Sequence, residues 1–228
     1  MNRADDLIVN NNPKSAFSES IKTIRTNLQF SGIDKDIKII LNTSPEPSDG
    51  KSFISANLAI AYAQEGKKVL IIDCDLRRGI QNEIFDIGKN QSKGYSNLIL
   101  NFNEKIDLSK YFVKTKINNV VLLGTGIYPP NPVELLGSKN NDLLINTLRS
   151  LFDVIILDCP PVLGLNDTLI LTKFSDANIV VVSDKKTKII TLENTIKAFQ
   201  KVNASISGIV INKVKQKKGN NTSYYEQY

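Results

Sequence analysis

Histidine is absent from this chain of 228 residues. The protein therefore cannot build a histidine-based catalytic triad, a histidine zinc site or a histidine proton relay, and any acid–base chemistry falls to Asp, Glu, Lys, Tyr or Cys. Long apolar runs are also missing. None approaches the roughly 20 residues of a membrane-spanning helix, and the first residues do not form a signal peptide. We therefore expect a cytoplasmic protein.

Cysteine occurs only twice, as Cys74 and Cys159. Each lies in an apolar segment beside an aspartate, which predicts small buried thiols and not a disulfide framework. The other composition values, 41% hydrophobic and 23% charged residues, are those of an ordinary globular domain. A domain of this length buries roughly 70–75% of its unfolded surface, so it needs no cross-links.

The net charge is +6, and a basic chain of this kind raises the question of a nucleic-acid partner. Half of the excess lies in residues 213–228, which contain four lysines and one glutamate. The rest of the chain has no clustered basic stripe. We therefore expect no nucleic-acid partner, and we interpret the charge as that of a flexible tail.

Hydrophobic periodicity divides the chain into three parts. Residues 1–14 are polar and Asn-rich, which predicts disorder. From residue 15 a helical pattern begins, with apolar residues three or four apart at Phe17, Ile21, Ile24 and Leu28. Residues 15–212 form the predicted domain, and residues 213–228 are too polar to fold on their own.

Within the domain, short β-branched runs alternate with helical stretches. Six runs are predicted as strands: Lys38–Leu41, Val69–Ile72, Val120–Leu123, Val154–Leu157, Ile179–Val182 and Gly208–Ile211. Uninterrupted apolar strands that alternate with helices predict an α/β fold with a doubly wound, mostly parallel sheet. In such folds ligands bind at the carboxyl ends of the strands.

The first predicted strand is followed by the segment Thr43–Ser52, which ends in Gly50, Lys51 and Ser52, and then by a helical stretch. A loop of this kind holds phosphate with backbone N–H groups and a helix N-terminus, Lys51 would reach the terminal phosphates, and Ser52 would ligate Mg²⁺. The usual first glycine is replaced by Pro45. The predicted ATP contacts in this segment are Ser48, Asp49, Gly50, Lys51, Ser52 and Phe53.

Two further strands end in carboxylates, with Asp73 and Asp75 after one and Asp158 after the other. An apolar strand that delivers a carboxylate at its carboxyl end is the usual way of holding Mg²⁺ beside a phosphate loop. A single aspartate at such a place is as readily a turn or helix cap. Three that converge on one sheet edge favour a metal and nucleotide site, with one carboxylate free to act as a base.

Together these motifs resemble the bacterial tyrosine kinases that control capsule and exopolysaccharide synthesis. The resemblance rests on the phosphate loop, on Asp73-Cys-Asp75-Leu-Arg77, on Asp158-Cys-Pro-Pro161, on the segment Pro129–Leu136 and on Ile24–Leu28. It is closest to the split type, in which a transmembrane activator is a separate protein. It implies the P-loop NTPase fold of the MinD/ParA-like group.

The resemblance also implies roles for single residues. Lys51 and Ser52 would bind phosphate and Mg²⁺, Asp75 would ligate the metal, and Asp158 would hold it through water. Asp73 would be the base toward the tyrosine hydroxyl, so that Lys51 and Asp73 are the predicted catalytic pair. Asn212, at the end of the last strand, would contact adenine, although an asparagine there is also an ordinary turn residue.

This chain departs from the family pattern at two places in the second motif. Cys74 stands where glycine is usual, and Arg78-Gly79 replaces the usual Lys-Pro. Glu46 occupies the position of the signature lysine of MinD/ParA ATPases. This argues against the main alternative, an ATPase switch without kinase activity. A nucleotide-binding module without turnover is a third possibility.

Three tyrosines near the end of the chain, Tyr224, Tyr225 and Tyr228, lie in a stretch that is not core-like. We predict that they are autophosphorylation sites. The alternative is that this stretch is a random tail or a docking peptide that takes no part in the chemistry. A phenol with a pKa near 10 needs a base to attack ATP near neutral pH. The sequence leaves transfer within one chain or between chains open, and the resemblance favours transfer between chains.

Glu19, Lys22 and Arg25 recur every three residues on the first predicted helix, opposite its apolar stripe. They form either a solvated face or, by resemblance, an oligomerisation motif in which lysine replaces the middle arginine and loses its bidentate geometry. The resemblance implies that further copies of the chain are partners, as in a ring. It also implies a transmembrane activator, which binds through its cytoplasmic tail, and a cognate tyrosine phosphatase. The activator would recruit the chain to the inner face of the membrane.

Overall fold

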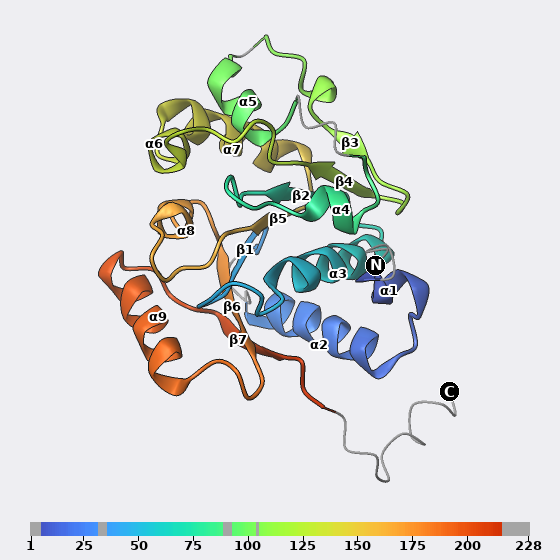
Figure 1. The fold of residues 1–228 in the computed structure, drawn as a ribbon. Coiled ribbons are helices and arrows are strands. Elements are labelled where there is room, and N and C mark those ends of the chain that lie inside the picture. The colour runs from blue at the N-terminus through green and yellow to red at the C-terminus, as the bar shows by residue number, and fades with distance from the viewer. Residues whose placement is uncertain (1–5, 32–35, 89–92, 104, 216–228) are drawn as a thin grey trace.

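The computed structural model describes residues 6–31, 36–88, 93–103 and 105–215. A seven-stranded sheet runs through its middle in the order β3-β4-β2-β5-β1-β6-β7 (Figure 1). Six strands are parallel, as predicted, and β3 pairs antiparallel with β4. The strands are β1 (Ile39–Thr43), β2 (Val69–Asp73), β3 (Val113–Lys114), β4 (Val120–Leu123), β5 (Val154–Asp158), β6 (Ala177–Ser183) and β7 (Gly208–Asn212).

All six strands predicted from the sequence are present, with ends that differ from the prediction by at most two residues. The seventh, β3, was missed because two residues carry no hydrophobic pattern. The helices of the described residues are α1 (Ile8–Asn11), α2 (Ala16–Ser31), α3 (Lys51–Gln64), α4 (Gln81–Ile84), α5 (Tyr95–Asn101), α6 (Pro132–Leu136), α7 (Lys139–Leu151), α8 (Asp167–Leu171) and α9 (Ile189–Lys201), with a 3₁₀ turn at Leu108–Lys110.

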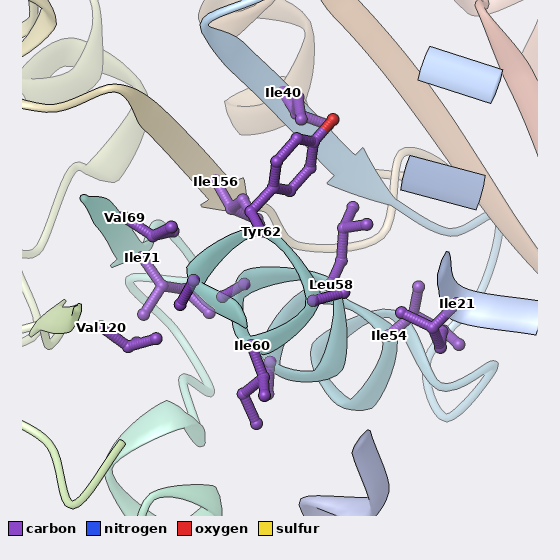
Figure 2. Close-up of a cluster of buried hydrophobic side chains, with 14 of the residues drawn as sticks. Ile21, Ile40, Ile54, Leu58, Ile60, Tyr62, Val69, Ile71, Val120 and Ile156 are labelled. Carbon is purple, nitrogen blue, oxygen red and sulfur yellow. The ribbon is translucent and has the colours of Figure 1, made fainter. Parts of the chain in front are cut away.

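The sheet is covered on both faces, which explains why its strands are apolar at successive positions. Within β5, Ile156 packs into the core that contains α1, α2 and α3, whereas Ile155 and Leu157 pack into the opposite core with α5 to α9. Figure 2 shows the first of these cores, in which Leu58 and Ile60 of α3 belong to one cluster with strand residues such as Ile71 and Ile156. The predicted doubly wound arrangement is therefore confirmed.

Helix α3 is the most buried helix of this core. Eleven of its 14 residues are buried, including four alanines whose small side chains allow close contact with the sheet. A helix that is apolar on all sides belongs inside a protein. Because α3 is held so firmly, its first turn at Lys51 has a defined position above the ends of the strands.

The prediction of disorder for residues 1–14 is wrong for the part that the structure describes. Leu7 and Val9 are buried against α3. The side-chain amide of Asn57 accepts a hydrogen bond from the Val9 N–H at 2.9 Å and donates one to the Asp6 carbonyl at 2.8 Å. A buried asparagine on the neighbouring helix therefore fixes this polar segment. Residues 1–5 lie outside the described residues.

The predicted helix at the start of the domain is α2, and its apolar stripe packs as expected, with Ile21 and Leu28 buried. The residues opposite the stripe are not all free. Lys22 pairs with Glu19 at 2.7 Å, but Arg25 lies against α3, donating to the Ala61 carbonyl at 2.8 Å and pairing with Glu65 at 2.7 Å. Of the two alternatives for these residues, the solvated face therefore does not hold for Arg25.

Among the described residues, no helix combines the length and the hydropathy that crossing a membrane requires.

Candidate nucleotide and phosphoryl-transfer site

The topology of the sheet brings the predicted site residues together. Strand β5 lies between β2 and β1, so that Asp158 is paired in register with Asp73 on one side and with Asn42 on the other. All three side chains sit at the carboxyl ends of parallel strands, where ligands of such sheets bind. Because β1 also leads into the phosphate loop, the carboxylates lie directly below the start of α3.

The phosphate loop has the conformation that its glycine predicts. Gly50 has a φ of +102°, and a Cβ there would lie 2.0 Å from the side-chain nitrogen of Asn212. The same nitrogen donates to the Asp49 carbonyl at 2.9 Å. Among the described residues, no side chain caps the N-terminus of α3. Its first N–H groups, together with the positive end of the helix dipole, therefore form an anion site.

Two lysines far away in the sequence support this loop. The ammonium of Lys186, from the segment after β6, donates to the Pro47 carbonyl at 2.9 Å, and that of Lys213 donates to the Ser48 carbonyl at 2.6 Å. The predicted ATP contact Asp49 is fully buried, and its backbone carbonyl receives the bond from Asn212. Its role in this structure is to hold the loop.

A cavity of about 660 Å³ opens beside the loop, a size that suits a nucleotide-sized ligand. Of the predicted site residues, it is lined by Ser48, Gly50, Lys51, Ser52, Phe53 and Asp75. Arg77 and Arg78 also line it, together with apolar residues such as Ile80 and Leu163. The lining thus combines charged and apolar side chains.

The ammonium of Lys51 lies among the carboxylates. It is 3.2 Å from Asp75 and 3.8 Å from Asp158. Burial lowers the pKa of Lys51, but the carboxylates of Asp158, Asp75 and Asp73 more than offset this and raise it above its usual value. Lys51 is therefore charged, and this one ammonium faces three carboxylates.

Asp73 is almost fully buried, and it is not among the residues that line the cavity. Burial, with the charge of Asp158 as the second cause, raises the pKa of Asp73 to about 8. Its carboxylate accepts hydrogen bonds from the backbone N–H groups of Asp75 at 3.2 Å and Gln81 at 2.9 Å. The cavity-facing member of the pair is Asp75.

Gly79, one of the two family departures, lies directly over Asp73. A Cβ at this position would be 2.5 Å from one Asp73 oxygen and 2.1 Å from Thr125. A side chain on residue 79 would therefore displace either the backbone or Asp73. The other departure, Cys74, is a buried free thiol like Cys159, as the sequence predicted for both.

Asp158 is fully buried and bound by two neighbours that sequence reasoning did not identify. Ser55 donates to it at 3.1 Å, and the side-chain amide of Gln81 donates to it at 2.8 Å. Ser55 lies one helical turn beyond Ser52 on α3, a spacing that could have indicated it. Gln81 follows Asp73 by eight residues with no recognisable pattern, and only the fold reveals its position.

The loop after Asp75 is fastened to α8 by an ion pair. The Arg77 guanidinium donates to the two oxygens of Asp167 at 3.0 and 3.2 Å. Asp167 is fully buried, and the same pair raises the pKa of Arg77. A bidentate pair of this kind gives the segment after β2 a defined orientation along the cavity.

The described residues contain no group of three or more acidic or thiol side chains arranged to surround a metal ion. Mg²⁺ is held by one or two carboxylates together with phosphates and water, and Asp75 with the Ser52 hydroxyl at the cavity offers donors of that kind. The Lys51 ammonium is paired with two carboxylates, Asp75 at the cavity and Asp158 behind it. The Ser52 hydroxyl lies 3.2 Å from the Lys51 ammonium. An oxygen atom that could ligate a metal therefore lies next to the anion site.

A family model described as an AAA domain matches residues 37–211. CapB of Staphylococcus aureus, named as a tyrosine-protein kinase, is 36% identical over 222 residues, which are 97% of this chain and 94% of CapB. The tyrosine-protein kinase YwqD of Bacillus subtilis (strain 168) is 33% identical over 220 residues, 96% of this chain and 91% of YwqD.

This chain belongs to the bacterial tyrosine kinases. The family resemblance in the sequence is thereby confirmed, and so is the predicted kinase class. The crystal structure of the chimerical protein CapA2B2 agrees in three dimensions: its TM-score is 0.87 at 34% identity, over 93% of this chain and 91% of that one. The P-loop fold expected from the sequence is therefore correct for this tyrosine kinase.

Proposed function

We propose that this tyrosine kinase uses Mg²⁺ and ATP to phosphorylate Tyr224, Tyr225 and Tyr228 of its own carboxyl-terminal segment, and that it thereby regulates capsular or exopolysaccharide synthesis. The observation that supports the site is the meeting of Lys51, Asp75 and the uncapped first turn of α3 at one cavity. The three tyrosines lie outside the described residues.

Each residue at the cavity has a part in this chemistry. Bound Mg²⁺ supplies charge neutralisation for the phosphates. With nucleotide and metal bound, the α3 N-terminus and Lys51 would bind phosphate oxygens, Ser52 and Asp75 would hold the metal, and Asp158 would hold it through water. Asp73 takes the proton of the tyrosine hydroxyl. Since Gly79 lies over Asp73, this last role requires the segment of residues 74–80 to shift when substrate binds.

The position of Lys213 supports the tail as substrate. Its ammonium holds the phosphate loop at Ser48, so the chain leaves the domain beside the cavity. From there Tyr224 lies 11 residues further on, a contour length of about 35–40 Å. A segment of that length reaches its own cavity or that of a neighbouring copy. We propose transfer between copies, in a homo-oligomer to which Glu19, Lys22 and Arg25 of α2 contribute.

Replacing Tyr224, Tyr225 and Tyr228 together by phenylalanine should remove at least about nine-tenths of the phosphate that the chain incorporates. The phenol oxygens are the acceptors, and phenylalanine has none. Incorporation from radioactive ATP measures this. The control is Tyr128→Phe, at an exposed tyrosine of the described residues, which should leave incorporation unchanged. Full incorporation in the triple variant would contradict the tail as substrate.

A mixture of two variants separates transfer between copies from transfer within one chain. Lys51→Met chains keep the tail and lose the site, and the triple phenylalanine variant keeps the site and loses the tail. Phosphate on the Lys51→Met chain in the mixture is expected. Its absence, while the wild type is phosphorylated, would mean transfer within one chain.

We further propose that a transmembrane activator binds this kinase through a cytoplasmic tail, recruits it to the inner face of the membrane and completes the site, and that a tyrosine phosphatase reverses the reaction. Alone, the purified chain should therefore phosphorylate itself slowly. Adding the cytoplasmic tail of the activator as a peptide should raise the initial rate at least about tenfold. Rapid stoichiometric phosphorylation without any added protein would contradict dependence on an activator.

A further inference from the structure

Gln81 is the fully buried first residue of α4 and lies outside the cavity lining. Its side-chain nitrogen donates to Asp158 at 2.8 Å and to the Ser52 carbonyl at 2.9 Å. Both partners are acceptors, so the orientation of the amide is determined and both of its hydrogens are used. Its backbone N–H donates to Asp73 at 2.9 Å. One residue thus joins two site carboxylates to the first turn of α3.

These contacts determine how Asp158 is presented. One Asp158 oxygen is held by Gln81, and the other accepts from Ser55 at 3.1 Å and lies 3.8 Å from the Lys51 ammonium. With a donor from α4 on one side and a donor from α3 on the other, the carboxylate cannot rotate. The oxygen that faces Lys51 is therefore kept toward the cation side of the site. Gln81 does this with a neutral group that adds no further charge to the three carboxylates.

The amide oxygen of Gln81 has no hydrogen-bond partner among the described residues although it is buried. An unpaired buried acceptor is unfavourable, and an apolar side chain of similar length would fill the same space without that disadvantage. Packing alone therefore does not explain a glutamine here. The donation to Asp158 and Ser52 does, because an apolar side chain cannot provide it.

We propose that Gln81 is a positioning residue of phosphoryl transfer, which orients Asp158 and Ser52 toward the Mg²⁺–nucleotide complex. The inference rests on the proposed function, because Gln81 contacts Ser52, which is proposed to hold the metal directly, and Asp158, which is proposed to hold it through water. Residues that orient metal ligands through hydrogen bonds affect metal affinity or activity by about 10–100-fold. Gln81 acts through these ligands and does not touch the substrate.

Gln81→Met tests this role, because methionine keeps the length and burial of the side chain, retains the backbone N–H on Asp73 and removes only the amide. Binding of a fluorescent ATP analogue in EDTA should stay within about twofold of the wild type. The Mg²⁺ concentration that half-saturates the metal-dependent gain in binding should rise about tenfold. At saturating Mg²⁺, kcat should fall about 10–100-fold with little change in KM for ATP.

The matched control is Gln64→Met, the same substitution at the far end of α3, where the amide donates to the Val9 carbonyl at 3.2 Å. It should leave the Mg²⁺ dependence unchanged. If Gln81→Met does not fold, Gln81→Asn replaces it, since asparagine keeps the amide chemistry but is one methylene too short to reach Asp158.

Suppose that nucleotide binding by the wild type depends on Mg²⁺ and that a folded Gln81 variant needs the same Mg²⁺ concentration for half-saturation. This result would overturn the positioning role alone. Equal losses of nucleotide binding with and without Mg²⁺ would also overturn it, because they indicate a purely structural role. A wild type whose nucleotide binding ignores Mg²⁺ would overturn the proposed metal site, and this inference with it.

Discussion

Lys51→Met should reduce tyrosine phosphorylation about 10³-fold or more. The Lys51 ammonium lies 3.2 Å from Asp75 at the start of α3, where terminal phosphates would bind. Removing a single hydrogen-bond donor to the charge that develops in a transition state costs about 10²–10³-fold in rate, and a cation acting on phosphoryl transfer contributes more. Methionine keeps the length of the side chain, so the loss is that of the charge.

The measurement is the initial rate of phosphate incorporation from radioactive ATP at saturating Mg²⁺. Lys67→Met serves as the matched control, because Lys67 is an exposed lysine beyond the other end of α3. Thermal unfolding of both variants shows whether the fold is kept, since Lys51→Met also leaves Asp75 and Asp158 without their ammonium. A folded Lys51→Met variant that incorporates phosphate at the wild-type rate would refute the assignment of the site.

Asp73→Asn and Asp75→Asn should fail in different ways. Asp75 faces the cavity beside Lys51, so Asp75→Asn should weaken Mg²⁺-dependent nucleotide binding about 10-fold or more. Asp73 lies behind it, so Asp73→Asn should bind Mg²⁺ and nucleotide nearly as the wild type does. Transfer should nevertheless slow by about 10²–10⁴-fold, the usual contribution of a positioned base.

The raised pKa of Asp73, about 8, supports this division of roles. A group that is buried beside Asp158 takes up a proton near neutral pH, as a base must. Replacing it by neutral asparagine also relieves repulsion with Asp158, so the variant should remain folded. Titrating a fluorescent ATP analogue into both variants at several Mg²⁺ concentrations distinguishes them. An identical Mg²⁺ dependence in the two would show that the carboxylates share one role.

Most of the tertiary architecture followed from local sequence patterns. Uninterrupted apolar strands alternating with helices determined the parallel sheet, because strands covered on both faces need apolar residues at every position. Aspartates at the ends of two strands, and a Gly-Lys-Ser segment at the end of a third, determined where the site would be. The carboxyl ends of parallel strands share one edge, so these residues had to lie close together.

Two features depended on contacts that local patterns do not encode. Residues 6–14 are ordered because Asn57, some 50 residues away, binds their backbone at Asp6 and Val9. Arg25 faces α3 because the crossing of α2 and α3 brings Glu65 within 2.7 Å of it. Neither contact has a periodicity or a motif by which the sequence alone would reveal it.

The division of labour within the site is the clearest case of the same limit. The sequence by itself determined that Asp73, Asp75 and Asp158 would share one edge of the sheet, through strand periodicity. It did not determine which of them faces the cavity or that Gln81 joins them. Those facts depend on the path of residues 74–80, where Gly79 lies against Asp73 and α4 begins above Asp158. Such a loop is shaped by its tertiary contacts, and only the folded structure decides it.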